Sequence, residues 1–379
     1  MGSSNATAAP KFAHRKQADF YATLRQRINA YFVENKIAKT GNWKLYLKSV
    51  VFLSFYILPL VALIAFQFSL GWTMLSYVVM GISMSGIGFC IMHDAIHGSY
   101  SEKPWLNTLM SHTISIIGGN RVSWKIQHNV LHHTYTNVHG HDEDIENKPI
   151  LRLSPDGKLL PIHRFQQYYA IFLYGLSTVS WATTKDVKQI RDYDKSGLLA
   201  KVGAKKSEVM TEIFLSKMVY YIMFFVIPFT LGNLPWYAYL AGFFAMHFMA
   251  GVITTVVFQL AHVVEHTDFF QPDDANELEN SWAVHQLMTT ANFAKRNRFV
   301  NWFVGGLNFQ VEHHLFTNIS HVHYTEIAPI VKQTALEFGI PYYEFDTFGQ
   351  AVASHWKTLR MLGIPNSSAV CFTIGAISV

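Results

Sequence analysis

Four long apolar runs set the strongest limit on how this chain can fold. They cover roughly residues 49–69, 73–92, 214–232 and 236–261. A helix of about 20 apolar residues rises about 30 Å, which matches the hydrocarbon core of a bilayer. Only 15% of the 379 residues are charged, whereas about 25% is usual in a soluble domain. The pattern predicts an all-α integral membrane protein with four transmembrane helices.

The four runs form two hairpins, because very short connections near residues 70–72 and 232–235 join each pair. Neither connection holds a Lys or Arg. Positive residues concentrate on the cytosolic side of membrane proteins, so we expect both termini and the segment between the hairpins in the cytosol. The net charge of +5 then describes a membrane-facing surface and not a nucleic-acid partner. A bacterial cytoplasmic membrane is favoured, or the endoplasmic reticulum in a eukaryote.

The chain is expected to form one membrane domain over residues 1–379. A helical spacing of apolar residues over 18–34 predicts an amphipathic helix on the membrane surface. Two further apolar segments, 107–119 and 165–183, are short or carry polar residues, and they are expected to form interfacial helices. The successive parts are a cytosolic N-terminal segment (1–48), a first hairpin (49–92), a cytosolic middle segment (93–213), a second hairpin (214–261) and a cytosolic C-terminal segment (262–379).

Ten histidine or glutamine residues form four clusters, and the predicted topology places all four clusters on the same side of the membrane. Residues at i and i+4 lie on one helix face, so such a pair can direct two imidazoles at one centre. Adjacent residues point about 100° apart on a helix, which suits ligands of two different metals. The clusters are His93/His97, His128/His132/His133, His262/His266 and Gln310/His313/His314.

Eight or nine imidazoles exceed the needs of one ion, since zinc takes four ligands and octahedral iron six. Two metals are therefore expected, with His262 as the weakest ligand candidate. The clusters hold no Cys, which disfavours a structural zinc site or an iron–sulfur cluster. His247, within the fourth run, is expected to be a hydrogen-bonded structural residue. Nearby acids are expected to accept the second imidazole N–H: Asp94, Asp142, Asp144, Glu265 and Glu312.

Two functions outside enzyme chemistry fit the sequence less well. A transporter or metal carrier would be expected to hold ionisable residues along its spans, but only His247 lies deep in a run and Lys217 lies near an edge. A receptor-like protein with a structural metal would differ from an enzyme in having closed coordination and no O₂-dependent turnover.

The motifs HDAIH (93–97), HNVLHH (128–133), TYTNVHGHDEDI (134–145) and NFQVEHHLF (308–316) resemble those of membrane fatty acid desaturases. The resemblance covers roughly residues 18–350. Within the last motif, the histidine box QVEHH (310–314) begins with Gln310, as in the front-end branch, which acts near the carboxyl end of an acyl chain. The resemblance implies a di-iron centre that uses O₂ to introduce a cis double bond into a polyunsaturated or unsaturated acyl chain. A related membrane di-iron hydroxylase or a sphingolipid desaturase is the alternative.

The resemblance also implies roles for individual residues. In the family, the position of His262 holds an Asn that reaches the metal through water, and the position of Gln310 holds a His ligand in other desaturases. A ligand gained at 262 is therefore expected to offset one lost at 310. The family ligands correspond to His93, His97, His128, His132, His133, His266, His313 and His314.

The implied partners are a fatty acyl substrate, as acyl-CoA or acyl-lipid, O₂, membrane lipid and an electron donor. Many front-end enzymes carry a fused b-type cytochrome with a His-Pro-Gly-Gly motif, which this sequence lacks. A separate ferredoxin or b-type cytochrome is therefore expected. The basic cytosolic segments could dock an acidic carrier or bind anionic lipid. The residues considered for this are Lys185, Lys188, Lys205, Lys206, Lys295, Arg296 and Arg298.

Overall fold

The computed structural model describes residues 9–13, 17–146 and 150–365. Within these residues, four helical stretches are long and apolar enough to cross a membrane. They confirm the predicted four spans in two hairpins, although the first begins at Trp43, earlier than expected. The spans are α2 (Trp43–Ala65), α3 (Leu70–Gly86) with η1 (Ile87–Met92) and α4 (His93–Ile96), α13 (Lys206–Tyr221) with η4 (Ile222–Val226) and α14 (Ile227–Leu231), and α15 (Trp236–His262).

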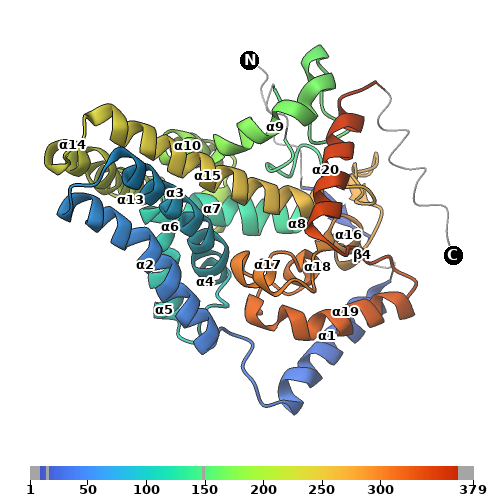
Figure 1. Ribbon diagram of the computed structural model, residues 1–379. Coiled ribbons are helices and arrows are strands. Elements are labelled where there is room, and N and C mark those ends of the chain that lie inside the picture. The colour runs from blue at the N-terminus through green and yellow to red at the C-terminus, as the bar shows by residue number, and fades with distance from the viewer. Residues whose placement is uncertain (1–8, 14–16, 147–149, 366–379) are drawn as a thin grey trace.

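Helices α3 and α15 pack closely along the middle of the spanning bundle (Figure 1). Glycines permit this approach. A Cβ atom on Gly81 would lie 2.4 Å from the carbonyl oxygen of Met246, and one on Gly242 would lie 2.1 Å from the ring of Tyr77. Small residues at a helix contact let the backbones approach in membrane proteins. This packing helps to fix the C-terminal ends of the second and fourth spans, where His93 and His262 lie.

Most of the remaining helices form a cap at one end of the spans, whereas residues 166–182 pack along α15 itself. Helix α20 packs across the C-terminal part of α15 (Figure 1). Two short parallel strand pairs tie distant segments of the cap together, β1 with β2 and β3 with β4. The elements are β1 (Lys11–Phe12), α1 (Ala18–Glu34), α5 (Pro104–Ser111), α6 (Thr113–Ile116), α7 (Arg121–Lys125), η2 (Ile126–His132), α8 (His133–Tyr135), η3 (Pro161–Phe165), α9 (Gln166–Gly175), α10 (Ser177–Ala182), α11 (Lys185–Lys195), α12 (Leu198–Lys201), β2 (Glu277–Leu278), α16 (Trp282–Met288), β3 (Ala291–Phe293), α17 (Arg298–Phe303), α18 (Gln310–Leu315), η5 (His321–His323), α19 (Tyr324–Glu337), β4 (Tyr343–Phe345) and α20 (Phe348–Leu362).

Helix α1 has the bounds that its apolar spacing predicts, but its predicted place on the membrane surface is wrong. Phe20, Leu24, Ile28 and Phe32 are at most 4% exposed and belong to a core with residues of α16, α18 and α19. The apolar stripe therefore faces the cap and not the lipid. An amphipathic pattern alone cannot distinguish these two partners, since both bury the same face of the helix.

The two segments expected to be interfacial are each broken into shorter helices. Residues 107–119 fall in α5 and α6, with a break at His112, and residues 165–183 fall mainly in α9 and α10, with a break at Leu176. Each of the four helices has at most ten residues, which is too short to cross a bilayer core. The four-span prediction therefore needs no revision on their account.

Three π-helical turns interrupt the regular helices. Turn η4 precedes Pro228, which has no N–H to donate to the preceding turn. Turn η1 ends immediately before His93, and η2 contains His128 and His132. Single π-helical turns occur often at functional sites, because they change the direction in which later side chains point. Two of the three turns set the direction of the clustered histidines.

Candidate metal centre

Seven imidazoles, from four helical elements and the residue that follows α4, gather in two clusters at the junction of the spans and the cap. In each cluster, one nitrogen of every ring lies within 4.8 Å of the corresponding nitrogens of the others. His97 is partly buried and the other six residues are buried. The first cluster consists of His93, His97, His128 and His313, and the second consists of His132, His262 and His314.

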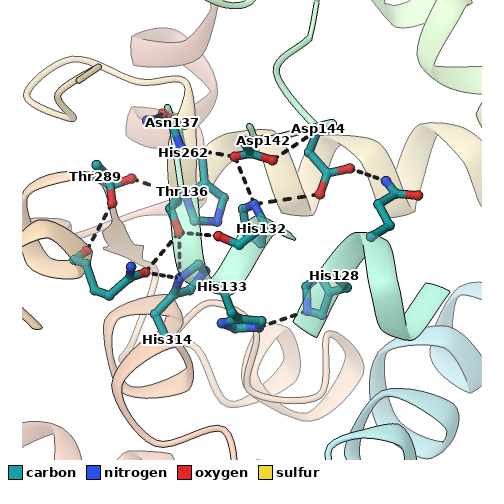
Figure 2. Close-up of polar contacts among 12 residues, drawn as sticks. His128, His132, His133, Thr136, Asn137, Asp142, Asp144, His262, Thr289 and His314 are labelled. Atoms are coloured by element: carbon teal, nitrogen blue, oxygen red, sulfur yellow. Dashed lines mark hydrogen bonds and ion pairs between the residues drawn. The ribbon is translucent and has the colours of Figure 1, made fainter. Parts of the chain in front are cut away.

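The second cluster has the protonation pattern that a metal site needs. The Nε2 atoms of His132, His262 and His314 are buried and have no hydrogen-bond partner among the described residues. Their Nδ1 atoms each face an acceptor, so the ring proton is held at Nδ1 and the Nε2 lone pairs converge (Figure 2). Metal-bound histidines are oriented in this way. The acceptors are Asp142 Oδ2 for His132 (3.0 Å), Gln286 Oε1 for His314 (2.7 Å) and the Thr289 carbonyl for His262 (3.2 Å).

The first cluster brings two ring nitrogens unusually close. His93 Nε2 lies 3.2 Å from His313 Nε2. Two ligands at about 2.1 Å from one ion and at right angles to each other are about 3.0 Å apart. The Nε2 atom of His97 is buried and without a partner among the described residues. His313 Nδ1 faces the hydroxyl of Tyr324 at 3.2 Å. The donor set therefore fits a metal ion in this cluster too.

His133 lies between the two clusters. Its Nε2 atom is 3.1 Å from His128 Nε2, and its ring centroid is 4.6 Å from that of His313 and 4.4 Å from that of His314. Adjacent histidines thus divide as the 100° spacing predicts, with His313 in the first cluster and His314 in the second.

His128 and His132 also lie close to each other. One ring nitrogen of each lies within 4.8 Å of the other and of a carboxylate oxygen of Asp144, which agrees with the expectation that both can face one centre. Each residue also belongs to a different one of the two clusters above. The π-helical turn η2, in which the backbone repeats at i+5, additionally brings His128 and His133, five residues apart, face to face.

Burial sets the protonation of the ligand set. It lowers the pKa of His128, His133, His313 and His314 well below the ordinary value, and the neighbouring imidazoles lower it further. These rings are neutral at pH 7 and present lone pairs. Burial also opposes the charged form of His132, but the Asp142 carboxylate raises its pKa overall.

The structure does not bring His266 into either cluster. Helix α15 ends at His262, and His266 is exposed with a left-handed backbone (φ 78°), its ring stacked on Tyr343 at 5.9 Å. The i+4 rule fails because the helix stops before the second residue. The residue expected to be the weakest ligand, His262, lies inside the second cluster. Gln310 is buried at the start of α18, one turn before His313.

Three of the five predicted acids lie beside ligand imidazoles. Asp142 orients His132 and also accepts the backbone N–H groups of Asn137 and Asp144, each at 3.0 Å. Asp144 Oδ2 lies 3.7 Å from the same nitrogen, His132 Nδ1 (Figure 2). Asp94 Oδ1 lies 3.6 Å from His93 Nδ1.

The other two acids do not contact a clustered imidazole, and their predicted role is wrong. Glu265 follows the end of α15 and pairs with Lys357 on α20. Glu312 lies on the far side of α18 and accepts hydrogen bonds from Asn292 and Tyr342, each at 2.8 Å. Their place in the motifs suggested proximity, but proximity in sequence does not fix the helix face.

Several residues that position the ligands gave no sequence signal. Gln286 and Thr289 lie in or just after α16, far in sequence from the ligands that they orient. The ring of Trp124, four residues before His128 in the sequence, has its centroid 4.2 Å from that of His128. A buried lysine, Lys48 of α2, contacts His321 Nε2 at 2.9 Å.

The contacts of two histidines outside the clusters complete this picture. His321 Nδ1 in turn donates to Asp94 Oδ2 at 2.9 Å, so His321 is a buried link between Lys48 and the acid beside His93. His247 contacts Tyr220 at 2.7 Å and Thr178 at 3.1 Å. The prediction of a hydrogen-bonded structural role for His247 is confirmed.

Four imidazoles in one cluster and three in the other leave positions open around an octahedral metal, which takes six ligands. The two histidine clusters are largely buried, so bulk water is kept away from any molecule that binds at them. Such a centre can carry out redox chemistry on O₂ and an apolar substrate, which side chains alone cannot. A structural metal would instead be expected to have a closed ligand set.

Comparison with known proteins agrees with this chemistry. Residues 69–346 match the family model described as fatty acid desaturase. The chain is 34% identical over 364 residues to the sn-1 linoleoyl-lipid 6-desaturase of Arthrospira platensis, covering 95% of this chain and 97% of that protein. It is also 34% identical over 361 residues to the protein of the same description in Synechocystis sp., covering 94% and 98%. An acyl-lipid (8-3)-desaturase of Physcomitrium patens is 31% identical over 365 residues, covering 94% and 74%. The chain belongs to the fatty acid desaturase family.

Proposed function

We propose that this fatty acyl desaturase acts on an acyl chain carried by a membrane lipid and uses two iron ions held by the two histidine clusters. It inserts a cis double bond between an existing double bond and the carboxyl end. The observation that carries the proposal is the convergence of the buried, unpartnered Nε2 atoms of His132, His262 and His314 in the second cluster. Support for the lipid-linked substrate comes from the two cyanobacterial relatives, both described as sn-1 linoleoyl-lipid 6-desaturases.

The reaction explains why a metal pair is needed. A methylene group in an acyl chain has no acidic proton and no electrophilic carbon, so acid–base or nucleophilic side chains cannot attack it. Iron, when bound, would supply the redox activation of O₂. His93, His97, His128 and His313 would hold one ion, and His132, His262 and His314 the other, with His133 between them. We propose no direct ligand role for His266.

Residues around the proposed metal centre affect the protonation of the ligand imidazoles, their orientation and their exposure to water. Burial lowers the pKa of rings such as His128 and His313 and keeps them unprotonated. Acceptors at Nδ1 hold His132 and His314 in one tautomer. Such acceptors strengthen metal binding by the ring to which they bond. Gln310, buried at the start of α18, is proposed to line the first cluster without replacing a histidine ligand.

The overall reaction needs an external reductant. Two C–H bonds supply two electrons and two protons, whereas the reduction of O₂ to two waters takes four of each. Two electrons and two protons must therefore enter, and we propose a separate ferredoxin or b-type cytochrome as the donor. The termini and the middle segment are proposed to face the cytosol, in a bacterial cytoplasmic membrane, which fluorescent and phosphatase fusions at the C-terminus can test.

The test is turnover by purified protein in nanodiscs that contain an sn-1 linoleoyl lipid, with iron, O₂ and dithionite supplied. We expect two irons per chain and a new double bond, located by gas chromatography and mass spectrometry on the carboxyl side of the existing ones. His314→Ala protein is the matched inactive control. Protein that holds two irons yet forms no double bond, or adds oxygen instead, would overturn the proposal.

A further inference from the structure

The outer face of α11 carries an unusual set of basic side chains. Lys188, Arg191 and Lys195 lie at i, i+3 and i+7, which places them on one helix face. With Thr183 and Thr184 they line an open groove of about 450 Å³, in which Asp192 is the one acid. All three cations are exposed and form no ion pair within the part of the chain that the structure describes.

Neighbouring lysines are used differently. Lys206 pairs with Asp194 at 2.8 Å, and Lys217 pairs with Asp186 at 3.1 Å. These pairs balance charge within the fold. The groove on α11 instead presents three cations against one carboxylate, so it keeps a net positive charge for something outside the chain.

The inner face of α11 packs directly on the ligand-bearing helix. Ile190 and Tyr193 share a core with Ile126, the first residue of η2. A polar chain runs through the same contact. Gln189 Nε2 donates to Gln127 Oε1 at 2.8 Å.

This chain continues to the second histidine cluster. The side-chain amide of Gln127 donates to Asp144, and Asp144 Oδ2 lies 3.7 Å from His132 Nδ1. A helix with its side chains is about 10–12 Å across, so a partner on the outer face of α11 lies one helix away from η2. Hydrogen bonds then lead from that helix to a ligand.

We propose that the outer face of α11 is the docking surface for the electron donor, an acidic one-electron carrier protein. The inference rests on the proposed function, because only a reductive oxygen-using reaction needs such a partner. Each carrier is oxidised by one electron, and two carriers per turnover supply the two electrons that the two C–H bonds do not. Complementary charge raises the association rate of such a pair and fixes its orientation.

A second basic surface, at Arg296 and Arg298, has different neighbours from the α11 groove. Arg296 and Arg298 lie beside Phe299, which is 70% exposed, and near Trp302, which is 42% exposed. Cations next to exposed aromatics are typical of a membrane interface. The α11 groove has threonines and Val187 instead and no aromatic lining, which favours a polar protein partner.

The experiment compares two charge-reversal variants of the full chain in zwitterionic nanodiscs. Lys188→Glu/Arg191→Glu alters the groove, and Arg296→Glu/Arg298→Glu is the matched control. Binding of a plant-type ferredoxin and of a soluble b-type cytochrome is measured directly, and turnover is measured with the carrier that binds and with dithionite. Iron content and melting temperature confirm that both variants are folded.

For the α11 variant we expect the carrier Kd and KM to rise about tenfold or more at low ionic strength, since charge steering changes association by about 10–10³-fold. The difference should shrink as salt is added, and the dithionite-driven rate should not change. The control variant should bind the carrier as the wild type does. Because carrier binding is measured without turnover, a chain that binds the carrier through α11 but forms no double bond refutes the proposed reaction alone.

Three results would overturn the docking proposal. One is that the wild type binds neither carrier. Another is that both variants lose carrier affinity equally, or that neither does. The last is that the α11 substitutions change turnover with either reductant only when anionic phosphatidylglycerol is added to the nanodiscs, which would assign the groove to lipid.

Discussion

His262 and His266 give the sharpest test of the metal centre, because the fourth span ends between them. His262 contributes one of three converging Nε2 atoms, whereas His266 is exposed and stacked on Tyr343. We expect His262→Ala protein to bind one iron instead of two at limiting iron, and His266→Ala protein to bind both. The family resemblance instead implies that His266 is a ligand. The two variants therefore distinguish the ligand set seen in the structure from the one that the resemblance implies.

The size of the effect follows from the number of ligands. A structural zinc site with four ligands binds with about 10–16 kcal/mol, or about 2.5–4 kcal/mol for each ligand. At about 1.4 kcal/mol per factor of ten, loss of one ligand weakens binding about 10²–10³-fold. In the second cluster, two imidazoles then remain, and the first cluster keeps all four.

The assay is an iron titration of metal-free protein in detergent, with bound iron measured by mass spectrometry after gel filtration. Mössbauer or EPR spectra distinguish a coupled pair from a single ion. His262→Gln is a useful companion variant, since it keeps most of the volume and removes the imidazole. If His262→Ala bound two irons with unchanged affinity, or if His266→Ala lost one, the assignment of the second cluster would be refuted.

Three further predictions follow from the contacts around the centre. Asp142→Asn should weaken binding of one iron about 10–100-fold in the same titration, and Glu265→Gln should leave it unchanged; equal losses in both would contradict the positioning role of Asp142. Metal-free protein should lose stability as the pH falls below about 6.5, because rings such as His128 and His313 have lowered pKa values in the folded state and the unfolded chain binds more protons. The melting temperature should depend less on pH in iron-loaded protein. A melting temperature of metal-free protein that does not change with pH would contradict this prediction. Leu24→Ala should lower the free energy of unfolding by about 2–5 kcal/mol and so lower the unfolding midpoint, since Leu24 is fully buried in the core of the cap. An unchanged midpoint would contradict this packing and favour a place for α1 on the membrane surface.

The spans were predictable from the sequence because the bilayer imposes length and composition on each one separately. The sequence did not predict whether the apolar face of a cap helix contacts protein or lipid. The residues Phe20 to Phe32 of α1 face protein core, but the same stripe would also bind lipid, and one sequence carries no signal that distinguishes the two. Long-range packing with α19 decides the matter.

The site shows the same division. Ligand type and motif spacing pointed to His93, His97 and His313, but they did not predict that His128 and His132 would also belong to two different clusters. A π-helical turn has no clear residue signature, and it changed which rings face each other. The residues that hold the ligands, such as Gln286, come from distant segments and become visible only when the chain is folded.

The π-helical turn η1, which ends just before His93, has a consequence for how such proteins can be altered. A π-helical turn is equivalent to one extra residue within an α-helix. Deleting one residue from η1 would leave a span that is still long enough, but it would rotate His93 and His97 by about 100° about the helix axis. Grafting a span from one relative to another, or aligning two relatives across this region, therefore has to conserve the number of residues between bilayer and ligand. The lipid tolerates a change of one residue there, and the metal centre does not.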